Sequence, residues 1–316
     1  MSSTAKPAKP DDSTTGRHIP ALDGIRGLAL LLVLMFHMLW SNPYVSGPWI
    51  VRVLARAHMY GWMGVDLFFV LSGFLITGIL YDTLDDRHFF RNFYARRILR
   101  IFPLYYGFLL LVVVVTLATG HQVGWSTMVY FLTYTQSLVL HPVHALSTVP
   151  WINVNHFWSL AIEEQFYLMW PCAIFLLRTR RRIAIAAVCG ALLSVLVRII
   201  CVHYGLNRMQ PYIVYSWTPS HLDGLFLGGL LAMLVRSRCR ETLLRFGPTL
   251  FGFALLGLIL FDLRYSVNNF LVLDDPTAAV WGLLLVAVAA VTLVTATLKS
   301  GSVAQRVFAA PVLRFF

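Results

Sequence analysis

Residues 22–39 read LDGIRGLALLLVLMFHML, and this stretch indicates both the fold class and a first candidate site. After Arg26 the run stays apolar as far as His37, as expected of a membrane-spanning helix. An ionisable side chain inside a bilayer is costly unless it faces protein or water, so His37 is a candidate functional residue. Arg26 lies about 16 Å away along a helix that rises ~1.5 Å per residue. This predicted helix therefore carries a cation near one membrane face and a titratable base near mid-depth.

The composition extends this reading to the whole chain. Of the 316 residues, 58% are hydrophobic and only 12% are charged, and the mean hydropathy is +0.72. Soluble domains carry roughly one quarter charged residues, so we predict an all-α, polytopic membrane protein surrounded by lipid. The net charge is +11, but the arginines gather in short clusters between apolar segments. Such clusters favour cytoplasmic loops over nucleic-acid binding, and no nucleic-acid partner is predicted.

Apolar runs of about 17 to 25 residues predict the membrane spans. Eight runs qualify, namely 24–41, 60–81, 101–119, 157–177, 183–203, 220–236, 246–262 and 278–298. A ninth segment, 125–140, is short and contains several Ser and Thr residues. With a cytoplasmic N-terminus, all the arginine clusters fall on the cytoplasmic side only if this segment does not cross. We therefore predict that 125–140 is a re-entrant or interfacial element.

The remaining regions carry weaker signals. Residues 1–18 are rich in Ser, Thr, Pro, Asp and Lys, which is typical of a disordered tail, here placed in the cytoplasm. The four cysteines are far apart, with no CxxC pair and no histidine at metal-ligand spacing, so no metal site is predicted.

The second predicted span contains a carboxylate, Asp66, within GWMGVDLFFVLSGF (61–74). A carboxylate in an apolar run needs a partner such as His or Arg, unless it caps the helix at the interface. Asp66 and His37 both fall in the middle or outer part of the bilayer, on spans that are neighbours in the chain. Consecutive spans usually pack together, so a contact between the two side chains is geometrically possible.

A cluster of arginines opens the third span, in FYARRILRIFPLYY (93–106). Arg96 and Arg100 share a helix face, and Arg97 and Arg100 form a second close pair. Guanidinium groups in this arrangement can hold phosphates through paired hydrogen bonds. The alternative is a basic loop that sets topology and meets lipid headgroups.

Two further polar groups stand at helix entrances. Glu163 and Glu164 open the fourth span, and adjacent helical residues point about 100° apart, so at most one is expected to face a shared site. His221 and Asp223 precede a glycine-rich segment. They could line the same cavity or cap their helix, and we favour capping.

In these blocks the chain resembles the membrane-bound acyltransferase 3 family, integral-membrane O-acyltransferases that modify bacterial surface glycans and some small molecules. The resemblance covers roughly residues 18–316. It rests on LDGIRG with His37 (22–37), GVDLFFVLSGF (64–74), Arg97-x-x-Arg100 before Pro103, and WSLAIEEQFY (158–167). His221 departs from the pattern, since relatives often have Arg there.

The resemblance implies an acyltransferase domain over 19–316, which would have about ten helices in the family and lacks its last two here. It also implies a multi-pass protein of the bacterial inner membrane. The donor would be acyl-CoA, most simply acetyl-CoA, acting as a co-substrate with no bound cofactor. The acceptor would be a hydroxyl of a glycan or glycolipid.

Acyl transfer to a hydroxyl needs a base for the proton and a donor that stabilises the oxyanion. His37 is the expected base, either deprotonating the acceptor directly or carrying the acyl group itself, and either Asp66 or Glu163 would orient it. Arg26, Arg97 and Arg100 would hold the phosphates of acyl-CoA. Further candidate substrate contacts are Asp23, Glu164 and Tyr105.

Two alternatives remain open at this point. The acceptor could be a small molecule such as an antibiotic. In a different class, a proton-coupled transporter would use His37, Asp66 and Glu163 as a proton path. We see no paired inverted repeats or paired broken helices in the sequence to support a transporter.

Overall fold

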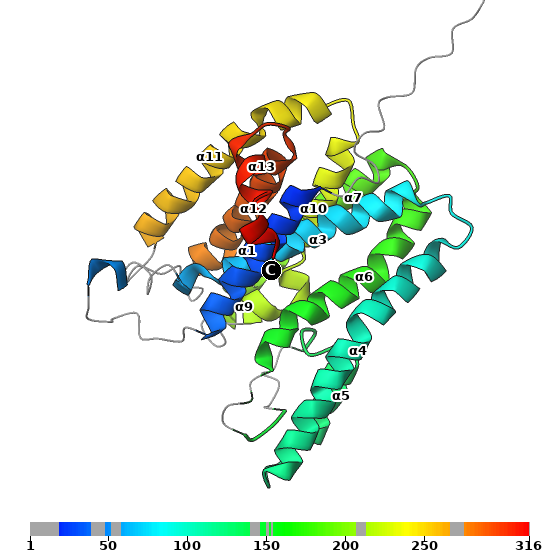
Figure 1. Cartoon of the computed structure of the whole chain (residues 1–316), viewed down its shortest axis with the longest axis vertical. Coiled ribbons are helices and arrows are strands. Elements are labelled where there is room, and N and C mark those ends of the chain that lie inside the picture. The colour runs from blue at the N-terminus through cyan, green and yellow to red at the C-terminus, as the bar shows by residue number, and fades with distance from the viewer. Residues whose placement is uncertain are drawn as a thin grey trace, which may run out of the picture.

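The computed structural model is a bundle of long helices (Figure 1). It describes residues 19–38, 48–51, 58–139, 146–149, 152, 154–206, 213–265 and 275–315. The predicted tail, 1–18, lies outside the described residues. These residues are mostly helical and contain no sheet, only an isolated bridge between Val123 and Ser147. The predicted all-α polytopic fold is therefore confirmed.

Within the described residues, seven helical stretches are long and apolar enough to cross a membrane. They are α1 (Pro20–Met38), α3 (Met63–Asp82), α4 (Phe89–Ala118), α6 (Trp158–Leu177), α7 (Arg180–His203), α11 (Arg240–Tyr265), and the π-helical turn η4 (Ala278–Gly282) continued by α12 (Leu283–Leu298). Seven of the eight predicted spans match these helices. Inside a bilayer the backbone can satisfy its hydrogen bonds only internally, which is why hydropathy locates them well.

The one remaining predicted span, 220–236, forms a shorter helix than expected. A 3₁₀ turn, η3 (Thr218–Ser220), precedes α10 (Asp223–Val235), which has 13 residues and a length of about 20 Å. Pro219 lies inside the 3₁₀ turn. The polar residues Ser220, His221 and Asp223 are buried where the run begins, so its first residues bind other helices instead of extending α10.

The short element predicted at 125–140 contains α5 (Trp125–Leu132), an eight-residue helix. Its length of about 12 Å is too short to cross the hydrocarbon core. Two tyrosines of α4 hold its end, because Tyr105 Oη donates to the Phe131 carbonyl at 2.8 Å and Tyr106 Oη to the Leu132 carbonyl at 3.0 Å. The structure thus agrees with a segment that packs on the bundle without spanning it.

The smaller elements complete the description. They are η1 (His58–Tyr60), η2 (Asn155–Phe157), α9 (Ile213–Ser216), α13 (Val303–Phe308) and α14 (Pro311–Arg314). Figure 1 shows α4 and α5 extending away at the lower right, while α11 runs along the opposite edge.

Basic residues from several turns meet at one end of the bundle. Arg178, after α6, contacts Asp85 at 2.9 Å, and Arg236, after α10, contacts Asp82 at 2.6 Å. Both acids lie at or just after the end of α3. These contacts agree with a topology in which the arginine clusters share one side.

α3 is the centre of the core and packs closely on α10. Gly73 and Gly228 lie at the closest approach, where an added Cβ would be 1.9 Å from the Leu225 carbonyl oxygen and 2.0 Å from that of Val70. Small residues at a helix contact let two backbones approach in this way. The rotation of α3 about its axis, and hence the direction in which its polar residues face, follows from this contact.

Gly228→Ala should therefore destabilise the bundle, because the new methyl group meets backbone that cannot rotate away. Overpacking a core costs about 1–3 kcal/mol, occasionally more. Gly252→Ala in α11 is the matched control, since an added Cβ meets nothing within 4 Å there. Detergent-solubilised yield and thermal midpoint should fall only for Gly228→Ala. Equal midpoints for the two variants would contradict this close approach.

Candidate active site

A cavity of about 820 Å³ opens among α1, α3, α4, α6, α10 and α11. Pockets of roughly 300–1,000 Å³ are usual for small-molecule ligands. Its lining includes six arginines, Arg26, Arg96, Arg97, Arg100, Arg236 and Arg240, and four acids, Asp23, Asp82, Asp86 and Glu163. Arginines therefore outnumber carboxylates around the cavity, which suits an anionic ligand.

The α4 arginines form one wall of this cavity. α4 begins at Phe89, earlier than the predicted 101, so Arg96, Arg97 and Arg100 lie on the helix itself. The Arg97 guanidinium stacks on the Tyr167 ring at 3.6 Å from its centroid. Among the described residues, none of these three arginines has a carboxylate in ion-pair contact. Their charges are thus available to a ligand.

Arg26 and Asp23 reach the same cavity from α1. The two side chains are 3.9 Å apart and both partly exposed, so their pairing is weak. The structure therefore brings together the three arginines that the sequence analysis proposed as phosphate ligands, together with Asp23.

A hydrogen bond between Ser72 and Glu163 lies along the cavity wall. Ser72 Oγ donates to Glu163 Oε1 at 2.8 Å, joining α3 to α6. Glu164 is not among the cavity's lining residues, as expected for adjacent helical positions. It lies instead near Tyr134, whose pKa is raised by burial and by the Glu164 charge.

Tyr105 joins α4 to the α5 segment. Its ring is buried and stacks on Tyr134 with centroids 4.4 Å apart, and its hydroxyl is bonded to α5. Tyr105 does not line the cavity. The predicted substrate contacts Glu164 and Tyr105 therefore belong to the α4–α5–α6 junction.

His37 lies near the other end of α1, outside the lining of this cavity. Its ring is exposed, and Nδ1 is 2.8 Å from the Val33 carbonyl of its own helix. The His156 ring contacts it edge-on, with centroids 5.5 Å apart. Desolvation and the nearby His37 lower the pKa of His156, so this imidazole is neutral near pH 7. The sequence reasoning missed His156, whose only signal was its place just before the Glu163 helix.

Neither candidate carboxylate touches His37. Asp66 Oδ1 accepts a hydrogen bond from His221 Nε2 at 2.9 Å, and no described contact joins His37 to Asp66 or Glu163. The reason is the packing of α3, whose Asp66 side is turned towards the start of α10 instead of towards the end of α1. Asp66 thus has the histidine partner that its chemistry requires, but a different histidine from the one considered.

A second buried pair lies next to this one. Arg198 of α7 donates two hydrogen bonds to the Asp223 carboxylate, at 2.9 and 2.7 Å, and a third to the Ser220 carbonyl at 2.9 Å. His221 and Asp223 make no side-chain cap, so the capping interpretation was wrong. The sequence analysis also missed Arg198. An arginine within the apolar run 183–203 was the signal, because a charge at that depth requires a partner.

Comparison with known proteins agrees with these features. The family described as "Acyltransferase domain" matches residues 19–315. "Putative O-acetyltransferase SACOL0978" of Staphylococcus aureus (strain COL) is 29% identical over 230 residues, covering 69% of this chain and 35% of that protein. "Putative peptidoglycan O-acetyltransferase YrhL" of Bacillus subtilis (strain 168) is 29% identical over 248 residues, with 69% and 33% covered.

A third relative is "Peptidoglycan O-acetyltransferase OatA" of Listeria monocytogenes (strain EGD-e), which is 31% identical over 163 residues, covering 49% of this chain and 24% of that protein. These matches span about a third or less of the relatives' lengths. No solved structure matches the chain significantly. Since the family match covers nearly all of the sequence, the resemblance noted from the motifs is confirmed, and this integral membrane protein belongs to the acyltransferase family defined by that domain.

Proposed function

We propose that this protein transfers an acyl group, most simply acetyl, from acyl-CoA to a hydroxyl of a cell-surface polysaccharide or glycolipid. The observation that carries the proposal is the arginine-lined cavity, which extends from the basic end of the bundle to Ser72 and Glu163. CoA is a polyanion with a long, flexible arm that ends in the thioester. Guanidinium groups bind its phosphates well because they donate paired hydrogen bonds.

In this proposal the basic end of the bundle, with the N-terminus, faces the cytoplasm, where acyl-CoA is found. Arginine-rich turns are retained on the cytoplasmic side of membrane proteins. The thioester would pass between α3 and α6 at Ser72 and Glu163, and the acceptor would approach from the opposite side, where His37 lies. The acceptor is proposed from the names of two relatives, a peptidoglycan O-acetyltransferase and a putative peptidoglycan O-acetyltransferase.

The chemical step balances in a simple way. The acceptor hydroxyl oxygen attacks the thioester carbonyl carbon, a C–O bond forms and the C–S bond breaks. His37 takes the hydroxyl proton, and the CoA thiolate leaves and is then protonated to the thiol. A general base of this kind accelerates a reaction by about 10²- to 10⁴-fold.

The test uses purified protein in liposomes with acetyl-CoA labelled in the acetyl group and a glycan acceptor. Label should appear in the glycan fraction and should be released by mild base, as an ester is. Label that stays in acetyl-CoA across a panel of glycan and small-molecule acceptors would overturn the proposal. Label found only in a small molecule would retain the transfer and correct the acceptor.

Replacing Arg97 and Arg100 together with alanine should raise the KM for acetyl-CoA by about tenfold or more. A hydrogen bond to a charged group contributes about 1.5–3 kcal/mol, and each 1.4 kcal/mol is a factor of ten. Arg91→Ala is the control, because Arg91 is exposed on the same helix outside the cavity lining. An unchanged KM in the double variant would return these arginines to a role in topology alone.

A further inference from the structure

A second group of arginines lines the cavity at the basic end of the bundle, in addition to the proposed phosphate ligands Arg97 and Arg100. Arg236 follows the last residue of α10, and Arg240 begins α11. Arg236 is bonded to Asp82 at the end of α3, ten residues from Ser72 on the same helix. At ~1.5 Å per residue, the Asp82 end of α3, which Arg236 contacts, is therefore about 15 Å from the Ser72 level.

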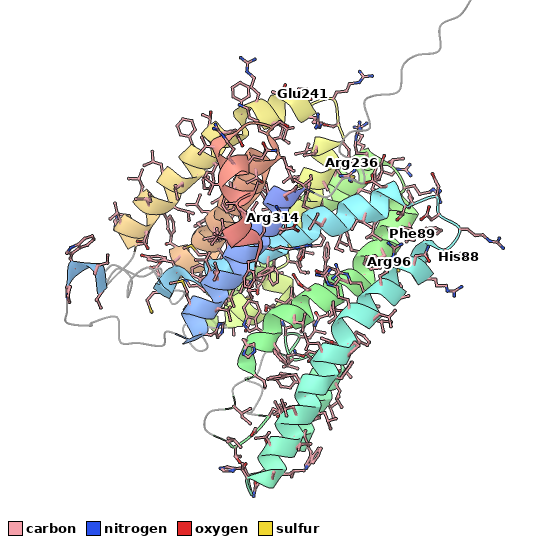
Figure 2. All side chains as sticks on the ribbon, in the orientation of Figure 1. His88, Phe89, Arg96, Arg236, Glu241 and Arg314 are labelled. Carbon is pink, nitrogen blue, oxygen red and sulfur yellow. The ribbon has the colours of Figure 1, made fainter. Side chains whose placement is uncertain are left out.

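Arg236 and Arg240 differ in how many of their hydrogen-bond donors already have partners. Arg236 gives two hydrogen bonds to the Asp82 carboxylate, at 2.9 and 2.6 Å, and a third to the Ala232 carbonyl at 3.0 Å. Its side chain is thereby fixed in place and its charge is largely balanced. Figure 2 shows Arg236 and Arg96 in the same region of the molecule, and both line the cavity.

Arg240 has unused capacity to donate. Its only carboxylate contact among the described residues is Glu241 at 2.7 Å, and the Glu241 side chain is 83% exposed. Such surface pairs contribute little to stability. The Nε of Arg240 is buried and bonded to no described group. A buried donor without an acceptor is unfavourable, so a ligand that supplies an acceptor here gains from it.

We propose that Arg240, supported by Arg236, binds the ribose 3′-phosphate of the acyl-CoA donor. This inference rests on the proposed function, because it assigns a part of the same donor. CoA carries phosphate at two separate places, the diphosphate that leads to the acyl arm and the 3′-phosphate on the ribose. Arg97 and Arg100 line the same cavity as Arg236 and Arg240, so one bound CoA can meet a separate arginine group with each of its phosphate sites. The phosphate of a lipid headgroup has the same chemistry, so the test must separate the two sources.

The first measurement needs only the wild-type protein in liposomes. The KM for acetyl-CoA should be about tenfold or more below that for 3′-dephospho-acetyl-CoA, the loss expected for one charge-assisted contact. Adenosine 3′,5′-bisphosphate should compete with acetyl-CoA more strongly than adenosine 5′-phosphate does. Equal KM values for the two thioesters would overturn this assignment and leave the proposed function standing. No turnover with either thioester would overturn both.

Arg240→Ala then locates the contact. It should raise the KM for acetyl-CoA about tenfold and leave that for 3′-dephospho-acetyl-CoA nearly unchanged, so that the preference disappears. Arg238→Ala, in the same turn but exposed and outside the cavity lining, should keep the preference. Equal rises for both thioesters would overturn the assignment and would fit a lipid headgroup or a structural role. Arg240→Gln, which retains part of the polar side chain, provides a second variant if the alanine protein is unstable.

Discussion

His37→Ala is expected to lower the rate of acyl transfer by about 10²- to 10⁴-fold, the contribution of a positioned general base. The protein should remain folded, because the His37 ring is exposed and its hydrogen bond to a described residue is made within its own helix. Initial rates with labelled acetyl-CoA measure the effect, and size-exclusion profiles in detergent report folding. The loss should appear in kcat, since the base acts on the acceptor proton and not on donor phosphates.

His203→Ala is the matched control for this variant. Both histidines lie in the last turn of a membrane helix and are exposed. His203→Ala should transfer acetyl groups at the wild-type rate. A wild-type rate in His37→Ala would remove His37 from the reaction. His156→Ala should then be assayed, because its ring is 5.5 Å from that of His37 and its imidazole is neutral near pH 7.

Arg198→Leu is expected to destabilise the folded protein severely, by about 3–5 kcal/mol, the usual result of removing one partner from a buried ion pair. Both side chains of the pair are almost completely buried, at 0% exposure for Arg198 and 2% for Asp223. The substitution leaves the Asp223 carboxylate without its two guanidinium hydrogen bonds. A lower thermal midpoint and lower detergent-solubilised yield should follow.

Asp223→Leu combined with Arg198→Leu provides the decisive comparison. Replacing both members of a buried pair with apolar residues is often neutral or even stabilising, so the double variant should recover much of the lost midpoint. Arg181→Leu is the control, because Arg181 is exposed on the same helix. If the single and double variants melt alike, the pair does not act as a unit. Loss of transfer activity with a recovered midpoint would instead give the pair a role in the site.

The network around this pair explains why α10 is short. Arg198 binds Asp223 and the Ser220 carbonyl, while His221 binds Asp66, so four side chains and one backbone carbonyl are used between α3, α7 and the start of α10. In a low-dielectric interior each of these groups is costly alone and favourable in combination. In the same network Asp66 is hydrogen-bonded to His221 and not to His37. In the described part of the chain no carboxylate is bonded to His37, so the proposed base acts there without one.

The sequence by itself determined the membrane helices and the character of 125–140. Both follow from a one-dimensional requirement, because every backbone polar group in a bilayer must be satisfied within its own helix. The sequence also grouped Arg26, Arg97 and Arg100, which line one cavity in the structure, since charge retention draws basic residues to the same end; that they bind acyl-CoA stays a prediction. It located α4 less well, because the hydropathy signal begins only after its arginines.

The tertiary structure alone decided which polar residues meet. α3 is apolar nearly all round, so periodicity gives no preferred face for Asp66 or Ser72. That choice depends on backbone contact between Gly73 and Gly228, which are far apart in the chain. With α3 packed closely on α10, Asp66 forms a hydrogen bond with His221, and Ser72 forms one with Glu163. The rotation of α3 in the packed bundle determines which residues Asp66 and Ser72 contact. The spacing of residues along one segment does not contain that information.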